Sequence, residues 1–389
     1  MLDLVLLLYT NVCLAFAKIF INLFSWFVPN WCSWSRFSES MLRSAEKKIL
    51  SYLRTAYRGW YVDIGPAVGP ADKIWTISLN ADAQKTPLLL LHGLGAGVAL
   101  WCLNLDSLAS NRPLYAIDML GFGRSSRPSF SSDAKIAEQQ LVKAIEEWRR
   151  EMNLDKVIIL GHSMGGFLAA SYSISYPQRV QHLILADPWG FPERTPDTPK
   201  KQIPLWVQAL VYTMSPFNPL AAIRAAGPWG EWIINKVRPD IERKFYTLIT
   251  EPGLITQYLY QCNSQTPSGE SAFHSMSAGL GWAKNPMIKR IGMLDKNLPI
   301  TLLYGSRSWV DNSVGELIKN QRPDSYVQLQ IISGAGHHVY ADKADVFNKY
   351  VTGACDYTEG VGNNKHPIIM PLTNDEIESN KEELEIDQL

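Results

Sequence analysis

The sequence is poor in cysteine, carries no net charge and lacks the residue spacings of a metal site. No Cys/His spacing is typical of zinc, and we expect neither a metal nor a cofactor. The 37 basic residues equal the 37 acidic ones, so no global attraction toward nucleic acid is expected. The cysteines are odd in number and form no C-x-x-C pair, which favours reduced thiols in a cytosolic protein; they are Cys13, Cys32, Cys102, Cys262 and Cys355.

The N-terminus is mostly apolar over residues 4–28, but it lacks the basic start and the A-x-A site of a signal peptide. Wound as a helix, it places its polar residues on one narrow stripe and leaves the other faces apolar. Tryptophans, which prefer the membrane–water boundary, follow directly: Trp26, Trp31 and Trp34. We therefore expect residues 1–35 to anchor the chain in an interface. A transmembrane or signal-anchor helix and an ordinary buried helix are the alternatives.

The rest of the chain is long and apolar enough, at 46% hydrophobic residues, for one large α/β domain. From Pro87 onward, apolar strand-like runs alternate with helical patterns, which predicts a mostly parallel sheet with helices on both faces. The alternation breaks over about 110 residues rich in Pro, Trp and Gly. The expected layout is a core over 38–187, a helical cap insertion over 188–297, a second core part over 298–355 and an acidic disordered tail over 357–389.

The strongest motif is Gly161-His162-Ser163-Met164-Gly165, which lies between the apolar run KVIIL and a helical pattern. This is the setting of a nucleophile elbow, in which a serine occupies a sharp strand-to-helix turn and only small residues fit two positions to either side. A serine hydroxyl needs a neighbouring base to become a good nucleophile. Ser163 is therefore the predicted nucleophile.

The predicted base is His337, which follows a glycine-rich turn after the last strand-like run; its neighbour His338 is the alternative. The acid that orients the imidazole is expected to be Asp311, the only carboxylate in the loop after PITLLYG. Asp187, at the end of the preceding strand of the sheet, is the alternative acid. These residues predict acyl transfer through a covalent serine intermediate.

Two backbone N–H groups are needed to bind the negative oxygen that forms when the serine attacks. We expect one from Met164, directly after the nucleophile, and one from Leu94 in the loop His92-Gly93-Leu94-Gly95. Together these motifs predict an α/β-hydrolase fold, with a mostly parallel eight-stranded sheet and a helical cap.

The chain resembles the abhydrolase domain-containing protein 4 and 5 subfamily of α/β-hydrolases. The resemblance runs from about Trp31 to about Lys349. Its most specific stretches are LGFGRSSRPSF, GHSMGGFLAASYSISYP, HLILADPWGFPERTP, RAAGPWG, CNSQTPSGE and GAGHHVYAD. One branch of the subfamily looks like the (lyso)-N-acylphosphatidylethanolamine lipases. The other is the lipid-droplet protein that co-activates a triglyceride lipase, in whose vertebrate members asparagine replaces the nucleophile.

The resemblance implies features of both branches. Ser163 makes hydrolysis chemically feasible, whereas Arg307, Gly336 and the tryptophan-rich N-terminus are similar to the co-activator branch, where they imply contact with a partner lipase and with droplets. The resemblance also brings an H-x4-D pattern, His337 to Asp342, linked to lysophosphatidic acid acyltransfer. From the residues themselves, we expect Asp342 to cap the helix that follows.

The sequence thus predicts a serine carboxylic ester hydrolase of lipid metabolism, of phospholipase or lipase type, in which acyltransfer is a second outcome. The expected substrate is a (lyso)phospholipid or a related acyl ester, and the expected location is cytoplasmic, peripheral on lipid droplets or membranes such as the endoplasmic reticulum. A droplet-bound co-activator of a triglyceride lipase, promoting lipolysis, is the alternative, and a soluble small-molecule esterase is a third class.

Overall fold

The computed structural model describes residues 37–194, 220–278 and 281–360. The predicted anchor with its three tryptophans, part of the predicted cap and most of the acidic tail lie outside these residues. Within them, no helix has the length and apolar character needed to cross a membrane.

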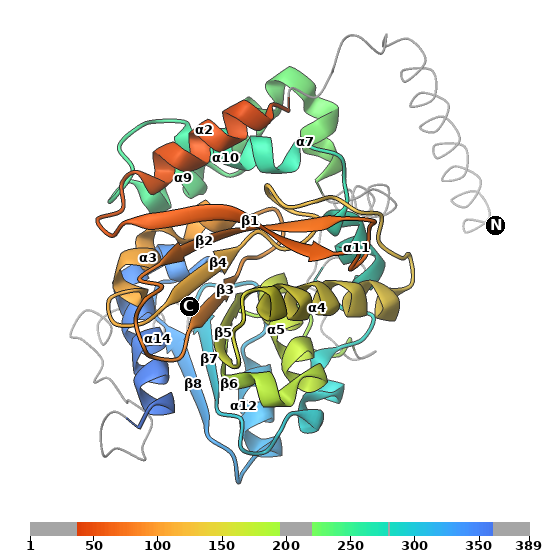
Figure 1. The fold of residues 1–389 in the computed structure, drawn as a ribbon, viewed down its shortest axis with the longest axis vertical. Coiled ribbons are helices and arrows are strands. Elements are labelled where there is room, and N and C mark those ends of the chain that lie inside the picture. The colour runs from red at the N-terminus through yellow and green to blue at the C-terminus, as the bar shows by residue number, and fades with distance from the viewer. Residues whose placement is uncertain (1–36, 195–219, 279–280, 361–389) are drawn as a thin grey trace, which may run out of the picture.

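One eight-stranded sheet forms the centre of the molecule, in the order β1-β2-β4-β3-β5-β6-β7-β8 (Figure 1). The first three strands in this order pair antiparallel, and every later pair is parallel. The α/β fold with a mostly parallel sheet is therefore confirmed. The strands are β1 (Tyr57–Gly65), β2 (Asp72–Leu79), β3 (Leu88–Leu91), β4 (Leu114–Ile117), β5 (Val157–His162), β6 (Val180–Ala186), β7 (Ile300–Gly305) and β8 (Val327–Ile332).

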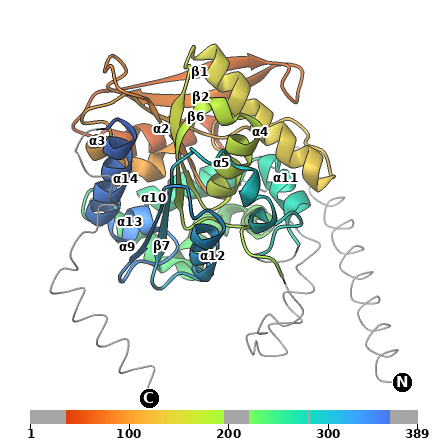
Figure 2. The same cartoon turned by 90° about the horizontal axis from the view of Figure 1, so that it is seen from below.

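The central strands are mostly apolar, as expected for strands with helices on both faces of the sheet. In β3, Leu89 and Leu91 join one buried cluster, and Leu88 and Leu90 join the other, as the two-residue repeat of a strand requires. Figure 2 shows α3 and α14 on one side of the sheet and α4, α5 and α12 on the other. These helices are α3 (Cys102–Leu108), α4 (Ala134–Glu151), α5 (Met164–Ser175), α12 (Ser313–Gln321) and α14 (Ala344–Thr358).

A group of helices lies between β6 and β7 in the sequence, although these strands are neighbours in the sheet. It comprises α7 (Ala221–Ala226), α8 (Gly230–Val237), α9 (Pro239–Phe245), α10 (Leu254–Asn263) and α11 (Gly269–Met276). The N-terminal helix α2 (Glu39–Leu50) packs beside α10, at the top of Figure 1. We call α7–α11 the cap. The one-turn helix α13 (Val339–Asp342) contacts α9 and so joins the cap to the loop after β8.

Candidate active site

The turn between β5 and α5 holds Ser163 in a backbone conformation that L-residues rarely adopt, with φ 53° and ψ −118°. Such a conformation costs about 1–3 kcal/mol and persists only when the surroundings enforce it. The two flanking glycines explain how it fits. A Cβ at Gly161 would lie 2.3 Å from the Gly165 carbonyl oxygen, and one at Gly165 would lie 2.4 Å from the Leu91 carbonyl oxygen. The motif is therefore a packing requirement of this turn.

The loop after β8 brings His337 to the serine. His337 Nε2 lies 3.0 Å from Ser163 Oγ, although 174 positions separate them in the sequence. The alternative histidine, His338, forms no hydrogen bond with Ser163 within the described part of the chain. Burial, reinforced by the charges of His337 and Lys244, lowers the pKa of His338 to about 3, so its ring is neutral at pH 7.

The carboxylate beside His337 is Asp187, and the expectation of Asp311 at this place is wrong. Asp187 Oδ2 lies 2.5 Å from His337 Nδ1. Asp311 is exposed at the start of α12, where its Oδ1 accepts the Ser313 N–H at 3.0 Å. Asp187 reaches the base because β6 and β7 end side by side, and the Asp187 N–H donates to the Leu303 carbonyl at 2.8 Å.

Asp187 is fully buried, and donors surround its carboxylate. The Ser308 hydroxyl donates to Oδ2, and the Gly305 N–H donates to Oδ1 at 3.2 Å. Both oxygens of Asp187 thus accept hydrogen bonds, and His337 Nδ1–H is the third donor to them. The imidazole is therefore held with Nδ1 protonated and Nε2 free to accept the Ser163 proton.

His162, the variable residue of the motif, also holds the backbone of His337 in place. The sequence alone did not predict this role. Its Nε2–H donates to the His337 carbonyl at 2.8 Å. Burial first, and the neighbouring histidines second, lower the pKa of His162 well below its usual value, so it stays neutral. Trp309 lies against the ring of His337, with the two ring centroids 4.8 Å apart.

The amides of Leu94 and Met164 both lie at the nucleophile. A Cβ on Gly93 would come within 3.2 Å of Ser163 Cβ, so the Leu94 loop touches the serine, and Met164 is the first residue of α5. Among the described residues, neither amide donates a hydrogen bond to the protein. Both N–H groups are thus available for an oxyanion, and the positive end of the α5 dipole adds to them.

His92 fixes the peptide that carries the Leu94 N–H. Its Nε2 accepts the Met119 N–H at 3.1 Å, so the proton sits on Nδ1, which donates to the Gly93 carbonyl at 2.8 Å. The Gly93 carbonyl and the Leu94 N–H belong to one peptide unit and point in opposite directions. Burial lowers the pKa of His92 and keeps this neutral tautomer in place.

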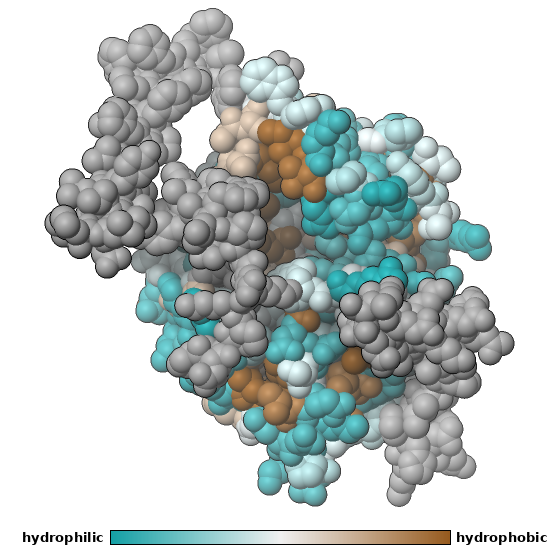
Figure 3. All heavy atoms as spheres, turned by 180° about the vertical axis from the view of Figure 1, so that it is seen from behind, coloured by the Kyte–Doolittle hydropathy of each residue, from teal (hydrophilic) through white to brown (hydrophobic). Residues whose placement is uncertain are grey.

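The cap lies over this site. Ser163 is only 7% exposed, and Asn263 on α10 donates to the carbonyl of Gly95, next to Leu94, at 2.7 Å. Figure 3 shows a hydrophobic patch at the cap end of the described surface and others toward the opposite end. Large exposed hydrophobic side chains of the cap region are Trp229, Trp232, Val237 and Tyr246.

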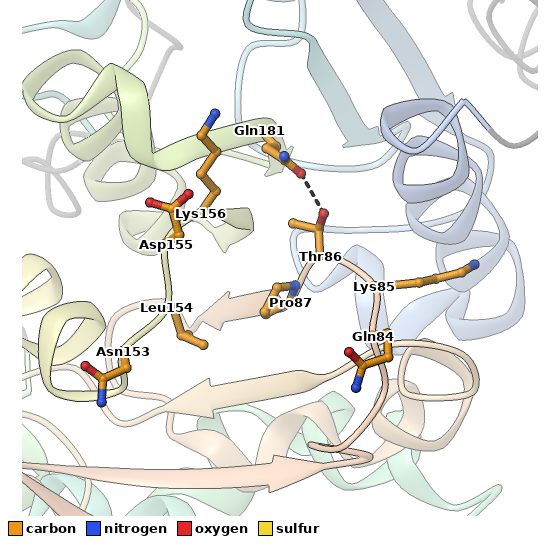
Figure 4. Close-up of a pocket in the computed structure, with 9 residues that line it drawn as sticks. All are labelled: Gln84, Lys85, Thr86, Pro87, Asn153, Leu154, Asp155, Lys156 and Gln181. Carbon is orange, nitrogen blue, oxygen red and sulfur yellow. Dashed lines mark hydrogen bonds between the residues drawn. The ribbon is translucent and has the colours of Figure 1, made fainter.

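A polar pocket elsewhere is lined by none of the side chains of Ser163, His337 and Asp187. Its lining residues come just before β3 and β5 and include Gln181 near the start of β6 (Figure 4). The pocket therefore lies at the amino ends of these strands, whereas Ser163 follows the carboxyl end of β5. Thr86 donates to Gln181 across it at 2.6 Å. Among the described residues, no group of three or more His, Cys, Asp or Glu side chains is placed to hold a metal ion.

Comparisons with known proteins agree with this geometry. A sequence model described as the alpha/beta hydrolase fold matches residues 86–344. The human protein 1-acylglycerol-3-phosphate O-acyltransferase ABHD5 is 50% identical over 322 residues, covering 82% of this chain and 90% of that relative. The human (lyso)-N-acylphosphatidylethanolamine lipase is 48% identical over 322 residues, covering 82% and 92%.

Solved structures show the same fold at low sequence identity. Naproxen esterase from Bacillus subtilis superposes with a TM-score of 0.56 at 14% identity, covering 82% of this chain and 98% of that one. A membrane phospholipase A described as a bacterial virulence factor gives 0.57 at 18% identity, covering 82% and 92%.

Proposed function

Because the chain belongs to the alpha/beta hydrolase fold family, and within it to the subfamily of the ABHD5 and (lyso)-N-acylphosphatidylethanolamine lipase relatives, we propose that it is a serine hydrolase of phospholipid or lysophospholipid acyl esters. The observation that carries the proposal is the line of contacts from Ser163 through His337 to Asp187. Both relatives are named for reactions of acylated, phosphate-containing lipids, which supports a lipid substrate.

In the proposed reaction, Ser163 Oγ attacks the ester carbonyl while its proton moves to His337 Nε2. Asp187 holds Nδ1–H and stabilises the imidazolium. The Leu94 and Met164 amides bind the oxyanion, and each such donor contributes about 3 kcal/mol to the transition state. His337 then gives its proton to the departing alcohol, and an acyl group remains on Ser163. Water, deprotonated by His337, releases the fatty acid.

The acyl-enzyme also supports a second outcome, acyl transfer. A lysophospholipid hydroxyl could replace water in the last step, since the same imidazole would deprotonate it. The name of the acyltransferase relative supports this outcome. We place either reaction at a membrane or lipid-droplet surface. The exposed tryptophans of the cap region, Trp229 and Trp232, and the tryptophan-rich residues 1–35 support that placement.

A fluorophosphonate probe tests the proposal, because it reacts only with an activated serine. We expect one adduct per chain, mapped by peptide mass spectrometry to Ser163, and none in Ser163→Ala. The labelled protein should no longer release fatty acid from lysophospholipid micelles. With the unlabelled protein, added 1-acylglycerol-3-phosphate should divert part of the acyl group into phosphatidic acid. An adduct on another serine, or unlabelled wild type with intact fold, would contradict the serine mechanism.

The second candidate is a binding role, the co-activation of a triglyceride lipase at droplets. The Arg307 N–H donates to the Ala335 carbonyl at 2.9 Å, so Arg307 and Gly336 lie on adjoining loops beside His337 and could form one contact surface.

If that surface recruits a lipase, Ser163→Ala should keep the stimulation of neutral-lipid mobilisation, whereas Arg307→Asn should lose it. Deletion of residues 1–35 should remove droplet binding as well. Fatty-acid release from droplet triglyceride by the added lipase measures the stimulation, and the fraction of the protein that floats with isolated droplets measures the binding. Loss of stimulation in the serine variant alone would speak against a binding role.

A further inference from the structure

One carboxylate near the base does not have the partner that the sequence suggests. Asp342 was expected to cap α14, but the residue before that helix is Lys343, which makes no capping bond with its side chain. Asp342 Oδ2 instead accepts the Gly336 N–H at 2.9 Å. Within the described residues it forms no hydrogen bond with His337, its partner in the H-x4-D pattern.

The bond to Gly336 holds the backbone directly before the base. Gly336 precedes His337, whose own carbonyl accepts the His162 Nε2–H at 2.8 Å. The backbone of His337 is therefore clamped on both sides by buried or half-buried side chains. Its Nε2 has to stay within about 0.5 Å of its position to take the Ser163 proton.

The other oxygen of Asp342 reaches the cap. Oδ1 contacts Lys244 Nζ of α9, and the two side chains are only 14% and 15% exposed. Lys244 Nζ also lies 3.7 Å from Asp240 Oδ2, and Asp240 forms two hydrogen bonds with Arg238. Arg238, Asp240, Lys244 and Asp342 thus form a row of alternating charges from the surface of the cap to the loop that carries His337. Removing one partner would leave a half-buried charge unpaired, which is costly.

We propose that Asp342 is a positioning residue for His337, and that Lys244 of the cap acts through it, so that the cap helps to set the catalytic geometry. This inference rests on the proposed hydrolase function. The cap then couples to both halves of the machinery: through Asn263 to the loop of the Leu94 amide, and through Lys244 and Asp342 to the base.

The test compares kcat and KM for a soluble short-chain ester, and the rate of fluorophosphonate labelling, across matched variants. Asp342→Ala should lower kcat and the labelling rate about 30-fold, because small misplacements of a catalytic group cost up to about 100-fold. KM should stay within about twofold. Asp342→Asn should recover part of the loss and reach the level of Lys244→Met, since its amide oxygen still accepts the Gly336 N–H but no carboxylate oxygen is left to pair with Lys244. Asp345→Ala, at an exposed carboxylate three residues further on, should behave as wild type.

The order of action gives a second, independent readout. Lys244→Met should lower kcat about threefold to tenfold, on the same positioning argument. The double variant Asp342→Ala/Lys244→Met should be no slower than Asp342→Ala, because Lys244 acts through Asp342. Wild-type kcat in Lys244→Met, or losses that multiply in the double variant, would overturn the proposal. If Asp342→Ala does not fold, Lys244→Met decides alone. Unlabelled wild type would instead refute the hydrolase function itself.

Discussion

Replacement of Asp187 by asparagine should lower kcat about 10⁴-fold, the size of the effect known for the same change in a serine protease triad. The reason is the set of donors around this carboxylate: the Gly305 N–H at Oδ1, and the Ser308 hydroxyl and His337 Nδ1–H at Oδ2. An asparagine has one acceptor oxygen. If that oxygen receives the Gly305 N–H, the amide NH₂ faces Nδ1 and moves the imidazole proton to Nε2, where the base can no longer act.

The matched control is Asp311→Asn, which removes the only carboxylate of the loop after β7. Asp311 is exposed and accepts the Ser313 N–H at 3.0 Å, a bond that asparagine can keep. We expect its kcat to stay within about twofold of wild type, because the base is untouched. Steady-state kinetics with a soluble ester, together with the melting temperature of each variant, measure the contrast. A large loss in Asp311→Asn, with an active Asp187→Asn, would reverse our assignment of the acid.

Why the sequence points to the wrong acid is instructive. Both carboxylates follow strands that end at the same edge of the sheet, and the chain order of nucleophile, acid and base is the same for either one. The choice depends on backbone geometry that sequence patterns do not encode. Asp187 has φ 47°, a value unusual for aspartate, and this turn directs its side chain toward His337. In Asp311 the carboxylate turns back to its own helix.

The parts of the site that depend on local sequence were predictable. The elbow follows from an apolar strand, two glycines and a helix, and His337 follows from a glycine-rich turn after the last strand. The parts that depend on contacts between distant segments were not. Neither His162, which holds the carbonyl of His337, nor Asn263, which crosses from the cap to Gly95, carries a signal in the sequence. Both act through a backbone carbonyl, which any residue provides.

The same limit applies to strand lengths. The apolar run 113–121 predicts a long strand, but β4 stops at Ile117. The next residue, Asp118, turns its side chain inward and accepts the Val98 and Arg124 N–H groups, each at 2.8 Å. A Cβ on Gly123 would lie 2.2 Å from its Oδ2, so the chain has to fold tightly around this carboxylate.

The second large effect concerns stability in acid. Burial lowers the pKa of His182 to about 3. It is also the largest cause that lowers the pKa of His338 to about 3. The unfolded chain takes up these protons near pH 6.5. Because the folded-state pKa is the lower one, the unfolded state binds more protons below pH 6.5, and stability falls as the pH drops from about 6.5 toward 3. Each such histidine costs about 1.4 kcal/mol per pH unit in that window.

These two residues alone should therefore remove about 4 kcal/mol of unfolding free energy between pH 7 and pH 5, a large part of the roughly 5–15 kcal/mol typical of a folded domain. Burial lowers the pKa of His92 and of His162 as well, which adds loss in the same direction. Urea unfolding at pH 7, 6 and 5 measures the change.

His182 allows the cause to be isolated from every other titrating group. Its Nδ1 and Nε2 lie 2.7 Å and 2.9 Å from the hydroxyls of Thr358 and Thr301. His182 lies near the start of β6, whereas Ser163 follows the end of β5. Among the described residues, no charged group contacts His182. His182→Gln keeps one donor and one acceptor but does not titrate. We expect the variant to be less stable than wild type at pH 7, and the gap to close by about 2 kcal/mol by pH 5. His274→Gln, at an exposed position of α11, controls for the loss of an imidazole. A gap that stays constant from pH 7 to pH 5 would mean that His182 does not take up its proton on unfolding, and the acid sensitivity would need another origin.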